Sequence, residues 1–179
     1  MNKKSALHVV ILFTATLITF FWVTDESLSY YSLQLTGILL LTLIITHHVL
    51  KPASFKLVES TVSTLAVLLV TEATGGISSP LFFLAFFLLF ELSLLLEPII
   101  PLFLSGAFIL FYLFTAQVNQ TGLNWLALLA FPTMTPLAYF LGKIYRKEEN
   151  QKKEIRNLQN KVETLKEELV QEEIGKNII

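Results

Sequence analysis

Residues 137–153, LAYFLGKIYRKEENQKK, contain the point where this chain changes character. Before Tyr145, apolar runs follow one another almost without a break, whereas residues 146–179 carry eight basic and eight acidic side chains. Few water-soluble domains are 54% hydrophobic and only 15% charged. The sequence therefore predicts an all-α protein, with an integral membrane bundle over residues 1–145 and a charged cytosolic linker helix over residues 146–179.

Six segments of the first 145 residues are apolar enough to be membrane spans, each of which needs about 20 mostly apolar residues. We predict transmembrane helices at Ala6–Val23, Leu33–Leu50, Phe55–Thr71, Leu81–Ile100, Leu102–Val118 and Leu123–Ile144. The third contains four Ser and Thr residues, which suits a helix that faces its neighbours, because hydroxyls can bond across helices. Pro98 and Pro101 predict a tight turn between the fourth and fifth spans.

The lysines orient these spans. The five basic residues of the membrane part all fall on one side of a six-span bundle: Lys3, Lys4, Lys51, Lys56 and Lys143. The other side receives only the acidic residues Asp25, Glu26 and Glu72. Because loops rich in Lys and Arg stay in the cytosol, we expect a multi-pass protein of the cytoplasmic membrane with both termini cytosolic. A five-span arrangement would place Lys143–Lys147 outside.

Composition also excludes several classes of function. The absence of cysteine rules out disulfides, thiolate metal sites and thiol nucleophiles. A net charge of −1 gives no indication of nucleic acid as a partner. His47 and His48 are adjacent and so about 100° apart on a helix, which does not suit a shared metal position. We therefore predict no catalytic residues, no metal site and no nucleic-acid partner, and a role in sensing or binding.

Residues 74–80, TGGISSP, form the most specific local pattern, which we call the glycine segment. It lies on the predicted outer side, between the third and fourth spans. Gly75 and Gly76 release the backbone from the third helix. We expect Ser79 to cap the next helix and Pro80 to occupy its first turn. Composition alone favours a turn between two helices, with glycines that end the first helix and Ser-Pro that begins the second.

The glycine segment resembles a motif in the membrane regions of many bacterial sensor histidine kinases. A related Gly-Gly-x-x-Asn-Pro-Phe motif in redox-responding kinases is linked to quinone sensing, although Ser79 stands here in place of Asn and Leu81 in place of Phe. The resemblance implies an inner-membrane sensor region, quinone as a ligand and a cytosolic kinase or other signalling domain as a partner. The kinase core has no counterpart in this sequence, so we expect a truncated, split or stand-alone relative.

The candidate ligand-binding residues come from the glycine segment, the phenylalanines that follow it and the intramembrane Glu91: Gly75, Gly76, Ser79, Pro80, Phe82, Phe83, Phe86 and Glu91. Phenylalanines spaced four residues apart form one face of the fourth span, which suits a flat ring, although ordinary packing is the commoner role.

Glu91 lies near the middle of the fourth span, where a charge costs about 2.5–3.5 kcal/mol, so it should face the bundle. Thr133 and Thr135 are its candidate hydroxyl partners. It is either a ligand contact or a neutral side chain bonded to a neighbouring helix. Pro132 and Pro136 predict a kink in the last span.

The linker helix carries a short heptad pattern. Ile155, Leu158, Val162, Leu165 and Leu169 are spaced alternately three and four residues apart. β-branched residues at a and Leu at d favour two parallel strands. Because the pattern covers only about two good heptads and its flanking like charges repel, we predict a weak homodimer.

We interpret the chain as the membrane input and transmission part of a histidine-kinase-like sensor that responds to a quinone, another apolar ligand or a membrane state. Two alternatives stay open. The substrate-binding subunits of some vitamin importers are also six-span chains of this size, and a structural membrane scaffold could use the linker as a docking helix.

Overall fold

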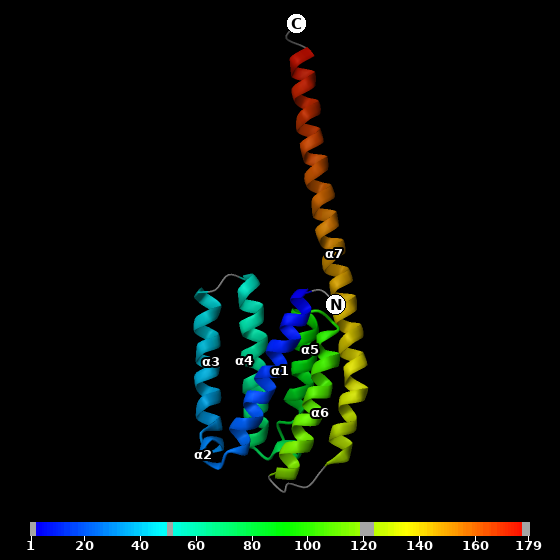
Figure 1. Ribbon diagram of the computed structural model, residues 1–179. Coiled ribbons are helices and arrows are strands. Elements are labelled where there is room, and N and C mark those ends of the chain that lie inside the picture. The colour runs from blue at the N-terminus through cyan, green and yellow to red at the C-terminus, as the bar shows by residue number, and fades with distance from the viewer. Residues whose placement is uncertain (1–2, 50–51, 119–123, 177–179) are drawn as a thin grey trace. The chain divides into compact units, whose positions relative to one another are not determined.

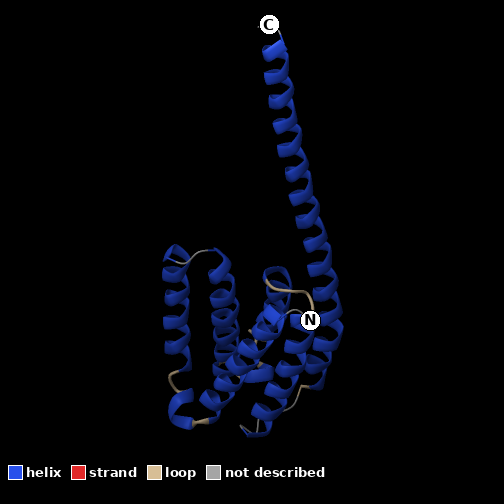
Figure 2. Ribbon diagram, turned by 45° about the horizontal axis from the view of Figure 1, so that its top comes forward, coloured by secondary structure: helices blue, strands red, loops and turns tan. Residues whose placement is uncertain are grey.

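The computed structural model describes residues 3–49, 52–118 and 124–176, and these are helical apart from short turns. The elements are α1 (Lys3–Thr24), α2 (Glu26–Ser29), α3 (Ser32–Val49), α4 (Pro52–Ala73), the 3₁₀ turn η1 (Gly76–Ser78), α5 (Phe83–Leu95), α6 (Ile100–Val118) and α7 (Trp125–Lys176). Figure 2 shows that short loops join them, without a strand in the described part of the chain. The predicted all-α class is therefore confirmed.

Three helices are long and apolar enough to cross a membrane. They contain the segments Ser5–Thr24, Ser32–Val49 and Trp125–Leu169. Two shorter apolar segments, Phe83–Leu95 and Ile100–Ala116, belong to α5 and α6. The composition and length of these helices fit a membrane protein, and the count of six spans stays a prediction.

The long helices of residues 3–142 run alternately up and down the bundle (Figure 1). α1 packs against α4 and α6, α4 also packs against α3 and α5, and α5 packs against α6. The end of α1, α2 and the glycine segment lie at one end of the bundle, and the starts of α1 and α4 lie at the other. Glu26 of α2 and Glu72 near the end of α4 therefore lie at the opposite end of the bundle from Lys56, which is near the start of α4. The predicted topology requires this separation of charges.

The core of the bundle consists of leucines and aromatic rings. Its largest fully buried side chains include Leu68, Leu88, Leu92, Phe108, Tyr112 and Phe131. They come from α4, α5, α6 and α7, so the core depends on the helices on both sides of the glycine segment.

The turn between α5 and α6 differs from the prediction. α5 ends at Leu95, short of the predicted Ile100, and Leu96 is already extended, with φ −109° and ψ −168°. Pro98 lies in the turn, but Pro101 lies in the first turn of α6, where a missing N–H is tolerated. The sequence also gave no indication of the short helix α2 or of η1.

The chain divides into two compact units, Met1–Gly142 and Lys143–Ile179, close to the predicted boundary at Tyr145. α7 is nevertheless one helix of 52 residues that contains Pro132 and Pro136. This confirms the predicted continuity of the last apolar segment with the linker helix. In the linker, the five heptad residues are 51–61% exposed in the single chain, so their seam is open to a partner.

Candidate functional site

The glycine segment is built on two left-handed glycines. Gly75 has a φ of 120° and Gly76 a φ of 61°, values that favour glycine because it lacks a Cβ. The amide of Ser78 bonds the carbonyl of Gly75, and the amide of Ser79 bonds that of Gly76, each at 3.1 Å. The two glycines therefore end α4 and turn the chain into η1.

Ser79 closes this turn and does not cap α5. Its buried Oγ accepts the amide N–H of Leu81 at 3.0 Å and bonds the hydroxyl of Thr74. The residue at the N-cap of α5 is Phe82, without a side-chain cap, and Pro80 lies before the helix. The expected cap is therefore wrong, because the Ser79 oxygen is bonded to Thr74 and Leu81, and α5 begins only at Phe83.

Glu72 lies against the glycine segment. A Cβ built on Gly76 would lie 3.2 Å from Glu72 Oε2 and 3.4 Å from Oε1. Thr115 of α6 donates its hydroxyl to Oε1 at 3.1 Å. Beside this contact, the hydroxyls of Thr71 and Tyr112 are hydrogen-bonded at 2.9 Å. The end of α4 is therefore joined to α6 by two side-chain hydrogen bonds directly below Gly76.

The sequence identifies Glu72 only as an acidic residue on the outer side of the bundle, so this contact with the glycine segment was not predicted. Glu72 precedes Gly76 by four residues, a spacing that puts two positions on one face of a continuing helix. That spacing was the one feature of the sequence that could have indicated the contact between Glu72 and Gly76. Only the structure reveals that Thr115 lies opposite.

Phe82 begins an aromatic cluster that reaches α7. Its buried ring lies 5.4 Å from Phe86, 5.0 Å from Tyr112 and 5.7 Å from Phe131 between centroids. The rings of Tyr112 and Phe131 are stacked at 6.1 Å. The cluster consequently connects Phe82, two residues after the glycine segment, with α6 and with the first part of α7.

The predicted phenylalanine surface is divided between two environments. Phe82 and Phe86 pack inside the bundle, whereas Phe83 and Phe87 are 48% and 65% exposed. The two pairs lie on different faces of α5, so the four rings do not line a common ligand-binding pocket.

Glu91 is bonded to a neighbouring helix, but not to the predicted one. Ser63 of α4 donates its hydroxyl to Glu91 Oε1 at 3.0 Å. The hydroxyls of Thr133 and Thr135 bond carbonyls of their own helix, α7. The predicted threonine partners are therefore wrong, because α5 turns this face toward α4.

α5 and α7 also approach closely near Gly142. The hydroxyl of Ser93 donates to the carbonyl of Ala138. A Cβ on Gly142 would lie only 2.6 Å from the carbonyl oxygen of Ser93, so this approach requires glycine.

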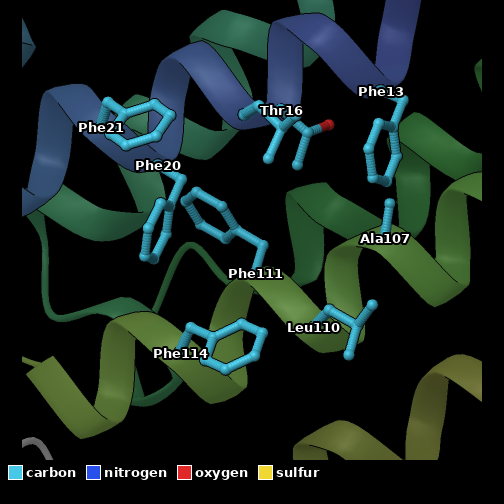
Figure 3. A pocket seen from close by; sticks show the side chains of 9 residues that line it. Phe13, Thr16, Phe20, Phe21, Ala107, Leu110, Phe111 and Phe114 are labelled. Carbon is cyan, nitrogen blue, oxygen red and sulfur yellow. The ribbon is translucent and has the colours of Figure 1, made fainter. Parts of the chain in front are cut away.

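An apolar groove lies between α1 and α6, and we call it the aromatic groove. Figure 3 shows Phe13, Phe20 and Phe21 on one side of it and Phe111 and Phe114 on the other. Its volume is about 430 Å³, and Thr16, Leu17, Ala107 and Leu110 complete its lining.

The one hydroxyl of the aromatic groove, that of Thr16, bonds the carbonyl of Leu12 in its own helix. The groove therefore offers almost pure apolar surface to a ligand. The predicted ligand residues on α5 do not line it, and the phenylalanines of the first and fifth spans were not recognised as facing each other.

No protein-family model, curated protein or solved structure matches this chain, so the candidate site rests on its geometry and on the sequence resemblance alone.

Proposed function

We propose that this chain is the membrane input and transmission module of a histidine-kinase-like sensor in a bacterial inner membrane, with six spans and both termini in the cytosol. The observation that carries the proposal is the set of contacts from the glycine segment to α7. Gly76 lies against Glu72, Glu72 accepts a bond from Thr115, and Phe82 contacts Phe131. Because α7 is one helix from Trp125 to Lys176, a change at Phe131 acts on the helix that includes the linker.

The stimulus in this proposal is a flat apolar molecule, with quinone as the first candidate, held in the aromatic groove. Ligand pockets commonly measure about 300–1,000 Å³ and are mostly apolar, which matches this groove. Phe111 lines the groove, and its ring lies 5.2 Å from that of Tyr112, a member of the aromatic cluster. Occupancy of the groove would therefore press on α6 at the residue next to Tyr112.

A chimera in which residues 1–179 precede a histidine-kinase core tests this assignment in membranes with and without quinone. Leu110 lines the groove and is 50% exposed, so Leu110→Trp should fill the groove and make the autophosphorylation rate independent of quinone. Leu102 lies on the same helix, is 51% exposed and is not among the lining residues, so Leu102→Trp is the matched control. Equal quinone responses of the two variants would refute the groove as the input site.

A further inference from the structure

A second cavity, of about 460 Å³, lies at the end of the bundle that carries the glycine segment, and we call it the acidic cavity. Glu26 and Ser29 of α2, Ser32 of α3 and Glu72 of α4 line it, together with Tyr30. Unlike the aromatic groove, it combines two carboxylates with hydroxyls. Lys, Arg and His are absent from its lining, so neither carboxylate meets a cation there.

Ser32 is the unusual member of this lining. It is only 1% exposed, yet its Oγ has no hydrogen-bond partner. Many buried hydroxyls of the bundle bond the carbonyl one turn earlier in their helix, as Thr36 does with Ser32 at 2.8 Å, whereas Ser5 near the start of α1 shares the unpartnered state of Ser32. Ser32 begins α3 and has no such turn before it. A buried hydroxyl without a protein partner is rare, and one that lines a cavity can accept a hydrogen bond from a molecule bound there.

We propose that the acidic cavity binds a small aliphatic primary amine in its ammonium form. The ammonium N–H groups would donate to the carboxylates of Glu26 and Glu72, and one would donate to Ser32 Oγ. The ring of Tyr30 can add a cation–π contact. The aliphatic part of the ligand would lie against Val23 and Ala73, the apolar members of the lining.

The geometry favours this chemistry over two other cations. A divalent metal needs a shell of oxygens at about 2.0–2.6 Å, and the cavity is far larger than an ion. Within the described residues, no three His, Cys, Asp or Glu side chains are close enough to hold a metal. A quaternary ammonium has no N–H to offer to Ser32.

Glu72 connects this cavity with the glycine segment, because the same carboxylate lines the cavity, accepts the Thr115 hydroxyl and lies against Gly76. Amine binding would therefore compete for an oxygen that positions the glycine segment. The amine site itself does not depend on the proposed signalling role, since its test needs no kinase.

The experiment uses the full chain in phosphatidylcholine nanodiscs and isothermal titration with 1,4-diaminobutane. We expect saturable binding that Glu26→Gln and Ser32→Ala each weaken by about tenfold, since the first removes the negative charge that faces the ammonium and the second removes a hydrogen-bond acceptor. Glu97→Gln removes a carboxylate that does not line the cavity and should leave the affinity unchanged. 1,4-Butanediol, of similar length but without charge, should not bind.

Absence of saturable binding to the wild-type chain, or an equal loss in Glu97→Gln, would overturn the proposal. Equal binding of butanediol would overturn it as well. Thermal melts of each variant identify folding defects, and Glu26→Asp, which keeps the charge, should bind more tightly than Glu26→Gln.

Nanodiscs that contain phosphatidylethanolamine distinguish the two sources of a primary ammonium. If this lipid weakens diaminobutane binding to the wild-type chain, its headgroup occupies the cavity. If it does not, the ligand is a soluble amine.

Discussion

The side chain of Glu91 illustrates how a polar residue is accommodated inside an apolar bundle. It lies on α5, whose other side chains are mostly leucine and phenylalanine, and it receives the hydroxyl of Ser63 at 3.0 Å. Hydrogen bonds between helices in membranes contribute about 0.6 kcal/mol on average and up to about 1.7 kcal/mol. The bond therefore helps to hold α4 and α5 in register without being essential for folding.

A double-mutant cycle measures this contact. The coupling between Ser63→Ala and Glu91→Ala should lie in the range of about 0.6–1.7 kcal/mol when the free energy of unfolding is measured in mixed micelles. The matched cycle pairs Glu91→Ala with Thr133→Ala, because Thr133 bonds the carbonyl of Ala130 in its own helix at 2.8 Å. A larger coupling in the second cycle would place Glu91 against α7 and not against α4.

The sequence predicts features of the candidate site only where their cause lies in the residue itself or in its own helix. The two glycines and their turn follow from backbone freedom, and the inward orientation of Glu91 follows from the cost of a charge among lipids. The partners of Glu72 and Glu91 come from other helices, and periodicity along one helix does not identify its neighbours. For the same reason the aromatic groove, which needs α1 and α6 together, could not be found from either segment alone.

At the scale of elements, α7 is the part that the sequence predicts best. The continuity of its linker part follows from the absence of a helix breaker between Gly142 and Gly175, although the helix also continues through Pro132 and Pro136. Two ion pairs offset by one residue, Glu148–Lys152 and Glu149–Lys153, have N–O distances of 2.7 Å and the favourable order of charges along the helix. α5 was predicted less well, because Leu96, Ile99 and Ile100 continue the apolar pattern of a span although α5 has already ended at Leu95.

The heptad seam of α7 gives a prediction about pairing. Leu158 and Leu165 are 55% and 57% exposed in the single chain, and burying such a seam against a second copy removes apolar surface from water. Single cysteines at these two positions should form disulfides with their own copy in membranes. A cysteine at Gln159, on the flank of the seam, should do so clearly less.

Because the chain has no native cysteine, each product of this experiment reports on one introduced position. Equal cross-linking at all three positions, or none at any of them, would mean that α7 does not form the parallel pair.

For the whole molecule, the number of membrane crossings is the feature that most needs a measurement. If only the three helices that are long and apolar enough to cross a membrane did so, the two termini would lie on opposite sides of it, whereas six spans place both in the cytosol. Periplasmic-reporter fusions at Ser29 and Ile77 should be active, and fusions at Ala53 and Asn150 should be inactive. Activity at Asn150 would contradict six spans and favour an odd number.

In the proposed function, the glycine segment acts on the helix that includes the linker. Gly76→Leu would introduce a side chain at a φ of 61°, against the carboxylate of Glu72. Gly37→Leu is the control, because a Cβ at Gly37 meets no atom within 4 Å. The measurement is the autophosphorylation rate of the kinase chimera in membranes, at equal amounts of inserted protein.

Couplings between two sites typically change equilibria by about 5- to 150-fold. We therefore predict that Gly76→Leu changes the autophosphorylation rate at least about fivefold, in either direction, and that Gly37→Leu leaves it at the wild-type level. A Gly76→Leu chimera that inserts normally and signals at the wild-type rate would contradict the account, and the glycine segment would then be only a turn between two helices.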